Sequence, residues 1–413
     1  MRRPMRLSPY LILLRRNPAF GRLYAAQLTS FAGDWFATVA LLGLALEMTG
    51  SSAVAALVLA LQTGGFAAAA PFAGIVADRF DRRRVLIAAD LARIPVALGF
   101  LLARDPETLW IAFAAILLLA VGAAVFEPTS SASLPNLVAP DDLPAANVLI
   151  GSAWGTMLAL GAALGGVVAA TLGRDAAFVA NAMSFAISAW LLFGIRTPLQ
   201  RPREPDHPTA TGPLDAITTT IAFARRRRIV GAYLLTKTSF GVGTGVVVLV
   251  AVFARSVFEA GDAGIGLLFA ARGLGALVGP FAARSLMGTD DAGLLRGIGW
   301  SFVILTVSYA LFPLAPGIVL ASALVFAAHC GGGAQWALST LGLQRATPDA
   351  IRGRIFSVDY GLVTLVIACS TLLAGFLADA VGPHVSAWTM VTLLALAGLG
   401  WFAFARSVKT EDR

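Results

Sequence analysis

Residues 48–84 read MTGSSAVAALVLALQTGGFAAAAPFAGIVADRFDRRR. The stretch Met48–Ala77 contains no charged side chain, whereas six of the next seven residues are charged. A helix needs about 20 apolar residues to cross the roughly 30 Å of hydrocarbon in a bilayer. The stretch is therefore long enough to span a membrane, and the charges after it mark the point where the chain leaves the lipid.

The same pattern recurs along the whole chain. Of its 413 residues, 58% are hydrophobic and 13% are charged, whereas a soluble domain carries about 25% charged residues. Leu143–Gly173, Ala176–Ile195 and Ala380–Ala405 contain no Asp, Glu, Lys or Arg. The pattern predicts an all-α membrane protein with twelve transmembrane helices, at 18–48, 51–77, 84–103, 108–130, 144–172, 175–195, 229–255, 262–284, 294–313, 316–344, 354–379 and 383–405.

Basic residues gather on one side of this topology. They lie before the first predicted helix, after the second, in the central polar segment and at the carboxyl end. Only Arg104, Arg174 and Arg255 fall on the opposite side. Cytoplasmic loops carry such an excess of Lys and Arg. We therefore expect a multi-pass protein of the cell (inner) membrane with both termini in the cytoplasm.

A proline-rich polar segment divides the chain into two sets of six helices. It contains five prolines between Pro198 and Pro213, which is typical of an irregular linker. The predicted domains are an N-terminal six-helix bundle at 1–196, a cytoplasmic linker at 197–228 and a C-terminal six-helix bundle at 229–413.

The two sets of helices show internal similarity. Thr29-Ser30-Phe31 recurs as Thr238-Ser239-Phe240, and Pro71-Phe72-Ala73 recurs as Pro280-Phe281-Ala282, both at an offset of 209 residues. Two parallel six-helix repeats are a known plan for transporters, with the substrate site near the bilayer midplane at the interface of the repeats.

The charged loop at Gly74–Arg83, GIVADRFDRR, joins the second and third predicted helices. It resembles the G-x-x-x-D-R-x-G-R-R/K loop motif of the Major Facilitator Superfamily, with Asp81 in place of the second glycine. The resemblance implies a cytoplasmic gate whose partner is the start of the eleventh helix. The alternative is a solvated loop of the positive-inside kind. The gate would comprise Gly74, Asp78, Arg79, Arg82, Arg83, Arg352 and Arg354.

Two further stretches are similar to branches of that superfamily. Gly161, Gly165 and Gly166 in the fifth helix are similar to the G-P-x-x-G-G stretch of drug/proton antiporters, with Ala162 in place of proline. Ordinary packing of small residues is the alternative. Phe126-Glu127-Pro128, with the Leu-Pro pairs after it, resembles the branch of bacterial siderophore (enterobactin) and macrolide exporters.

Ionisable residues within the predicted helices mark candidate functional positions, because a charge is costly to bury in a bilayer. Asp34 is the first candidate for a proton-coupling carboxylate and Glu127 is the second. A carboxylate in a cavity of low dielectric constant can exchange its proton near neutral pH. The alternative for Asp34 is a fixed ion pair with Lys237 or Arg272, and for Glu127 a substrate-cation site or an ion pair at a helix end.

The other residues singled out within the helices are assigned to different roles. Asp90 and Arg93 are three residues apart, so they share a helix face and are expected to form a structural intramembrane pair. Asp359 is assigned to the cytoplasmic charge cluster. For His329 the favoured interpretation is a packed histidine bonded to a backbone carbonyl. The substrate-cavity candidates are Trp35, Trp154, Lys237, Arg272, His329, Gln335 and Trp336.

These features favour a secondary active transporter that exports a small amphipathic or aromatic compound, drug-like or siderophore-like, in exchange for protons. The sequence has no G-x-x-x-x-G-K-[ST] phosphate loop and no catalytic or metal-binding histidine spacing. No enzyme activity, cofactor, metal or nucleic acid is expected. The expected partners are a small-molecule substrate, protons and membrane lipid, and the expected state is a monomer. Alternatives are an importer, a uniporter or a lysolipid flippase, and less favoured, a membrane receptor or enzyme.

Overall fold

The computed structural model describes residues 9–200, 213–287 and 290–408. Within these ranges, twelve helices are long and apolar enough to cross a membrane, which confirms the predicted all-α architecture. Most helix ends lie within a few residues of the predicted ones. The first elements are α1 (Pro9–Arg16), α2 (Pro18–Thr49), α3 (Ser52–Arg79), α4 (Arg82–Leu98), η1 (Gly99–Leu102), α5 (Leu109–Ser133), η2 (Leu134–Asn136), η3 (Pro140–Asp142), α6 (Leu143–Thr171) and α7 (Arg174–Phe193).

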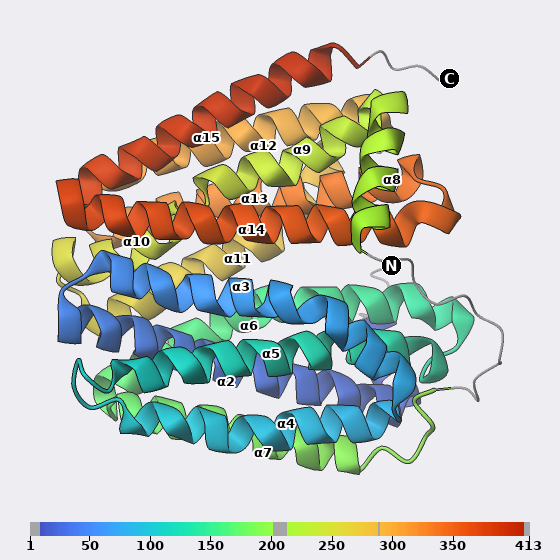
Figure 1. The fold of residues 1–413 in the computed structure, drawn as a ribbon, viewed down its shortest axis with the longest axis horizontal. Helices are drawn as coiled ribbons and strands as arrows, with labels where there is room; N and C mark the ends of the chain where they lie inside the picture. The colour runs from blue at the N-terminus through green and yellow to red at the C-terminus, as the bar shows by residue number, and fades with distance from the viewer. Residues whose placement is uncertain (1–8, 201–212, 288–289, 409–413) are drawn as a thin grey trace, which may run out of the picture. The chain divides into compact units, whose positions relative to one another are not determined.

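The remaining elements follow the polar segment (Figure 1). They are α8 (Pro213–Arg226), α9 (Arg228–Gly243), α10 (Val246–Val252), η4 (Phe253–Val257), α11 (Gly261–Met287), α12 (Asp291–Leu311), η5 (Phe312–Leu314), α13 (Ile318–Ala346), α14 (Asp349–Val381) and α15 (Pro383–Arg406). Contacts divide the chain into two compact units. Unit 1 is Met1–Leu41 with Gly65–Pro205, and unit 2 is Leu42–Gly64 with Asp206–Arg413.

In unit 1, α4 packs between α5 and α7, and in unit 2, α9 packs against α13, α14 and α15. The end of α2 and the start of α3 group with unit 2, although the predicted boundaries place them in the N-terminal bundle. Asp379 of α14 explains this grouping, because its carboxylate caps the first turn of α3. It accepts hydrogen bonds from the Ser51 hydroxyl (2.5 Å) and from the backbone N–H groups of Ser52 (2.6 Å) and Ala53 (3.1 Å).

The offset of 209 residues also relates packing contacts in the two units. In unit 1, a Cβ added to Gly161 of α6 would lie 3.1 Å from the Ala32 backbone of α2. The residue 209 positions after Gly161 is Ser370 of α14. Its hydroxyl donates to the Val242 carbonyl oxygen (2.6 Å) and accepts from the Gly245 N–H (2.9 Å). Corresponding helices therefore meet at corresponding positions in the two units: α2 meets α6 in unit 1, and the α9–α10 stretch meets α14 in unit 2.

The seventh crossing is interrupted, which the sequence analysis did not predict. α9 ends at Gly243, α10 begins at Val246, and the π turn η4 follows. Each glycine in this stretch weakens a helix by about 1 kcal/mol relative to alanine. Ser370 hydrogen-bonds to the backbone on both sides of the break, and so satisfies polar groups that lipid could not.

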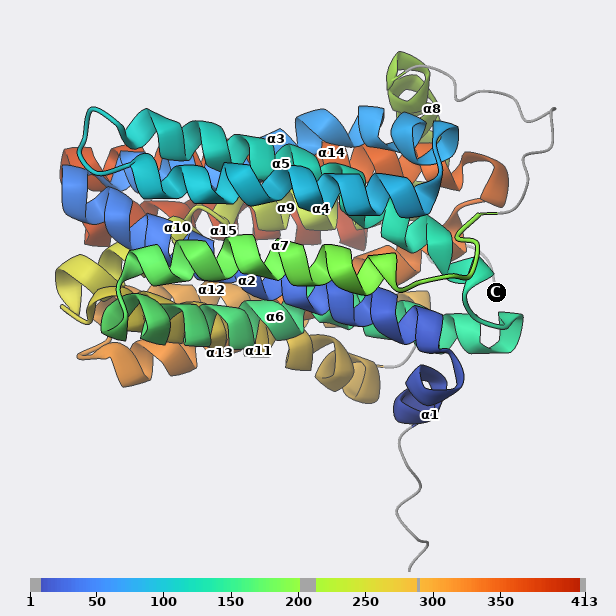
Figure 2. The ribbon, with the colours of Figure 1, turned by 90° about the horizontal axis from the view of Figure 1, so that it is seen from below.

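Two short helices carry basic last turns, α1 with Arg15 and Arg16, and α8 with Arg225 and Arg226. Figure 2 shows α1 beyond the first turn of α2, and α1 packs against α6. α8 runs crosswise to α14, against which it packs (Figure 1). Both have the amphipathic character of helices that lie on a membrane surface.

Candidate functional site

A buried arginine organises the interior of unit 1. Arg93 of α4 is 3% exposed and forms an ion pair with Asp90, one turn earlier on the same helix. Its guanidinium carbon lies 4.3 Å from the ring centre of Phe185 on α7 and 5.2 Å from that of Phe126 on α5. Such cation–π contacts contribute up to about 2 kcal/mol when the cation is desolvated. The sequence indicated the Asp90–Arg93 spacing, but not the two rings that enclose the pair.

Asp34 approaches this arginine from α2. Its Oδ2 lies 4.0 Å from Arg93 Nη1, and its side chain is 22% exposed, whereas Asp90 is fully buried. The structure thus gives Asp34 the partner Arg93, which was not among the partners considered from the sequence, Lys237 and Arg272. One guanidinium holds a buried carboxylate on its own helix and faces a more accessible carboxylate on another.

Glu127 of α5 adds a third carboxylate. It follows Phe126 directly, and it interacts electrostatically with both Asp34 and Arg93. One positive and three acidic side chains therefore share this interior. Because a bilayer solvates no excess charge, such a cluster favours binding of a proton or a cation.

Small residues allow these helices to approach one another. A Cβ at Gly122 of α5 would come 2.7 Å from Arg93 Cδ, and one at Gly33 of α2 would come 2.9 Å from Asn181 Oδ1 of α7. Asn181 is fully buried, and neither amide atom has a hydrogen-bond partner among the described residues. An unpaired buried polar group costs about 1–3 kcal/mol. Asn181 is therefore a further candidate binding residue, one that sequence analysis missed because a lone asparagine in an apolar helix forms no pattern.

Two tryptophans predicted to line a cavity lie together. The rings of Trp35 on α2 and Trp154 on α6 meet edge to face with their centres 6.1 Å apart. Trp35 is buried, whereas Trp154 is 42% exposed. An edge-to-face aromatic pair with one accessible member can bind an aromatic or amphipathic compound.

The predicted antiporter-like motif lies on the buried face of the same helix, α6. Gly161, Gly165 and Gly166 are all buried, and the first two face the backbone of α2. This is the geometry of small-residue packing between membrane helices. A role for the motif in proton exchange stays a prediction.

Replacing Gly165 by Val is expected to lower the melting temperature of the purified protein. A Cβ here would lie 2.8 Å from the Phe36 Cα, a backbone atom that yields only if α2 shifts. Overpacking of this kind costs about 1–3 kcal/mol. Gly151→Val is the matched control, because Gly151 lies on the same helix with open space around its Cβ position. Equal melting temperatures for the two variants would contradict the close packing of α2 and α6.

A second buried ion pair lies in unit 2. Lys237 of α9 pairs with Asp359 of α14, and both side chains are 1% exposed. The ammonium nitrogen lies 4.9 Å from the ring centre of Trp336 and 5.0 Å from that of Tyr360. The assignment of Asp359 to a cytoplasmic charge cluster is wrong, because burial against Lys237 removes its carboxylate from the surface. Two residues predicted from the sequence, Lys237 and Trp336, thus belong to one site. Asp359 and Tyr360 also belong to it, and neither was predicted as a site residue.

The other candidates in unit 2 are also enclosed. His329 Nε2 lies 2.6 Å from the Tyr309 hydroxyl, so this packed histidine bonds a side chain rather than the expected backbone carbonyl. Arg272 lies 5.7 Å from the Phe269 ring centre and interacts electrostatically with Tyr309. Gln335 is buried, and neither atom of its amide has a hydrogen-bond partner within the part of the chain that is described.

The predicted gate is described only in part. Arg82 donates to the Ala132 carbonyl oxygen (2.6 Å) at the end of α5, and Arg83 donates to the Phe193 carbonyl oxygen at the end of α7. Arginines in this position neutralise the negative ends of helices, so these two join α4 to its neighbours in unit 1. The structure does not describe the surroundings of the other predicted gate residues, which are Gly74, Asp78, Arg79, Arg352 and Arg354.

Asp81 replaces the second glycine of the loop motif without strain. Its side chain accepts a hydrogen bond from the Arg84 N–H (2.9 Å) and caps α4, and its φ of −61° is open to any residue. An aspartate N-cap stabilises a helix by about 1 kcal/mol. The loop therefore turns by capping α4, where the motif turns at a glycine.

Buried charge clusters within a set of twelve helices able to cross a membrane, counted over the described residues, are typical of a polytopic membrane transporter. The chain belongs to the family described as transmembrane secretion effector, a family of MFS-type transporters, whose pattern it matches over residues 9–412. The resemblance to the Major Facilitator Superfamily is thereby confirmed.

Several known proteins are similar to this chain. BacE of Bacillus amyloliquefaciens, provisionally named a bacilysin exporter, is 27% identical over 374 residues, which cover 87% of this chain and 88% of BacE. The lysophospholipid transporter LplT of Salmonella newport (strain SL254) is 33% identical over 164 residues, or 39% of this chain and 38% of LplT. A bacterial homolog of the human lysosomal transporter Spinster has the same fold, with a TM-score of 0.75, 16% identity and 98% of both chains covered.

Proposed function

We propose that this protein exports a small amphipathic or aromatic compound in exchange for protons, by alternating access. The observation that carries the proposal is the cluster around Arg93, in which one buried guanidinium serves Asp34 and Asp90 while Glu127 lies within electrostatic reach. Coupled export needs a charge inside the membrane that either a proton or the substrate can neutralise. The accessible Asp34 suits this role, while Asp90 keeps Arg93 in place.

Protonation of Asp34 would change the balance of forces at Arg93. Two unit charges about 4 Å apart attract by about 4 kcal/mol at an effective dielectric constant of 20, before any cost of desolvation. A difference of about 5.5 kcal/mol moves a two-state equilibrium from 1:99 to 99:1. Loss of the attraction on protonation of Asp34 would therefore shift the conformational equilibrium of unit 1, by less than this full reversal.

Residues of each unit are proposed to contact the substrate. Lys237 within its aromatic ring set suits a compound with an apolar body and a polar or acidic group, and Trp35 with Trp154 offers a second aromatic surface. The similarity to BacE supports export. The resemblance of residues 126–128 to siderophore and macrolide exporters supports substrates of that kind.

The orientation and the gate are parts of the same proposal. The excess of Lys and Arg on one side supports cytoplasmic termini in the inner membrane of a bacterial cell. The proposed state is a monomer. The loop from Gly74 to Arg83 would close the cytoplasmic side against the start of α14 near Arg352 and Arg354. Arg82 and Arg83 anchor that loop to α5 and α7.

A lysolipid flippase is the second candidate. The 33% identity to LplT over 164 residues favours it. A lysophospholipid is also an amphipathic molecule with a charged head, so the same clusters would serve it.

Asp34→Asn is expected to abolish accumulation driven by a pH gradient in inside-out vesicles. A difference of about one pH unit supplies about 1.4 kcal/mol per proton, enough to sustain about a tenfold substrate gradient. The variant should fall to a ratio near one yet keep substrate exchange, since exchange needs no net proton movement. Substrates to compare are an aromatic antibiotic, a siderophore and a lysophospholipid, and transport of the lysophospholipid alone would select the second candidate.

Asp175→Asn is the matched control, because Asp175 is an exposed carboxylate paired with Arg104 (2.8 Å). It should accumulate substrate as the natural protein does. Unchanged accumulation by Asp34→Asn would remove Asp34 from the coupling role.

A further inference from the structure

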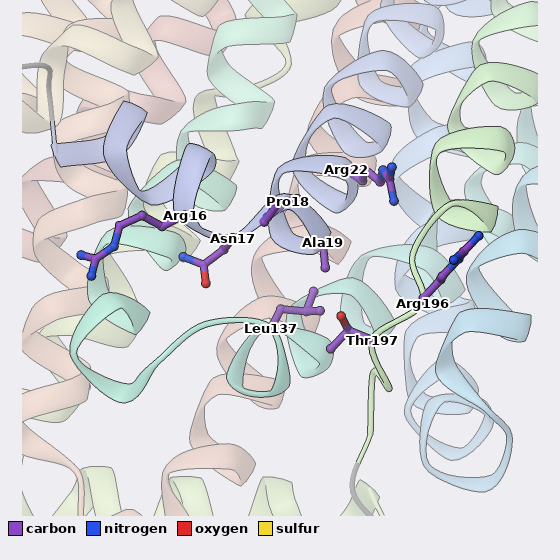
Figure 3. A pocket seen from close by; sticks show the side chains of 8 residues that line it. All are labelled: Arg16, Asn17, Pro18, Ala19, Arg22, Leu137, Arg196 and Thr197. Atoms are coloured by element: carbon purple, nitrogen blue, oxygen red, sulfur yellow. The ribbon is translucent and has the colours of Figure 1, made fainter.

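A pocket of about 340 Å³ opens in unit 1 where α2 begins and the chain leaves α7 (Figure 3). Its centre holds Ala19 and Leu137 beside the polar side chains of Asn17 and Thr197, and three arginines line its rim. Figure 3 shows Arg16 on one side of the pocket and Arg22 and Arg196 on the other, with Ala19 and Leu137 between them. The lining residues are Arg16, Asn17, Pro18, Ala19, Arg22, Leu137, Arg196 and Thr197.

The charge of this pocket is unbalanced. No acidic side chain lines it, and among the described residues no carboxylate pairs with Arg16, Arg22 or Arg196. Arg22 donates to the Gly194 carbonyl oxygen, which keeps its guanidinium at the rim. The pocket therefore suits a negatively charged group of a few atoms.

The level of the pocket in the membrane follows from the helices around it. The span in α2 starts at Pro18 and the span in α7 ends at Phe193, so the pocket lies where hydrocarbon gives way to lipid headgroups. Arginines at this level meet phosphates rather than bulk water. In the orientation proposed above, this is the cytoplasmic leaflet, whose surface is anionic.

The helix next to the pocket is built to enter the same layer. α1 is anchored by Leu13, which packs in one buried cluster with the pocket residue Leu137. Tyr10, Leu11 and Ile12 are exposed on α1 at 36%, 48% and 41%. An amphipathic helix with apolar residues and a basic end lies in the headgroup region of a bilayer. Lipid chains would cover these residues and place a headgroup beside Arg16.

The geometry points to a binding site for the phosphate headgroup of an anionic phospholipid, held between Arg16 and the Arg22–Arg196 side of the pocket. α1 packs against the acyl chains of the same lipid. The site is separate from the Arg93 cluster, and it does not depend on the transported substrate.

The site is tested with the full-length protein in detergent, by titration with dioleoyl-phosphatidylglycerol followed by native mass spectrometry. Arg16→Gln combined with Arg196→Gln leaves the Arg22–Gly194 bond intact and should weaken phosphatidylglycerol binding roughly 25-fold, about fivefold for each arginine. Arg16→Lys with Arg196→Lys keeps the charge and should retain most of the affinity, which separates lost charge from lost folding.

The matched control is Arg225→Gln with Arg226→Gln, two exposed arginines at the end of α8 whose removal costs the same net charge. It should change the affinity by less than about twofold. Equal weakening by both pairs would mean general attraction to a basic protein and would overturn the site. The site would also be overturned if phosphatidylcholine bound with the same affinity as phosphatidylglycerol. The same holds if sn-glycerol 3-phosphate alone bound as tightly as the lipid.

Discussion

Replacing Arg93 by Ala is expected to lower the free energy of unfolding by about 3–5 kcal/mol, because it leaves a buried carboxylate without its cation. Asp90 is fully buried, and Arg93 is its ion-pair partner. The substitution also empties the space between the Phe126 and Phe185 rings. The loss should appear as a lower melting temperature and a smaller yield of monodisperse protein, together with loss of transport.

A double variant separates charge from packing at this position. Arg93→Met with Asp90→Asn removes both charges and keeps a long side chain between the rings, so it should recover most of the stability. Replacing a buried ion pair by neutral groups of similar volume is often close to neutral. Transport should stay absent, since Asp34 then lacks its partner. Single and double variants of equal stability would contradict the pairing of Asp90 with Arg93.

Lys237→Met is the second substitution with a large expected effect. It leaves Asp359, which is 1% exposed, without a counter-charge in the interior of unit 2. We expect a loss of about 3–5 kcal/mol and loss of transport. Adding Asp359→Asn should restore the melting temperature but not transport, because the cation proposed to meet the substrate is still missing.

The control for this pair is the exposed ion pair Arg104–Asp175. Exposed pairs contribute about 0–1 kcal/mol, so Arg104→Ala with Asp175→Ala should change neither melting temperature nor transport. If the double variant at Lys237 and Asp359 transports as well as the natural protein, the pair only holds α9 to α14 and takes no part in binding.

The fold could be predicted because it depends on composition over long stretches. Uncharged runs of 20 residues or more leave few alternatives to membrane helices. What could not be predicted are local exceptions within those runs. The break between α9 and α10 depends on Ser370, which lies 125 residues after Gly245 in the chain. The association of the start of α3 with α14 depends on the single carboxylate of Asp379.

The sequence identified many of the candidate site residues, but mostly not which of them lie together. Asp90 and Arg93 were identified as a pair because a spacing of three residues places both on one helix face. Asp34 and Glu127 were identified as costly charges, but their common neighbour Arg93 lies on a third helix. Lys237 and Asp359 are 122 residues apart, and no periodicity relates them. Pairing across helices depends on tertiary packing, which the pattern of a single sequence does not contain.

The central claim is that substrate and proton compete for Asp34 beside Arg93. Proton release on substrate binding, measured with a pH-sensitive dye in weakly buffered detergent solution, tests it most directly. Linkage predicts release of up to about one proton per substrate bound by the natural protein, and none by Asp34→Asn. Equal proton release by the two proteins would contradict the claim.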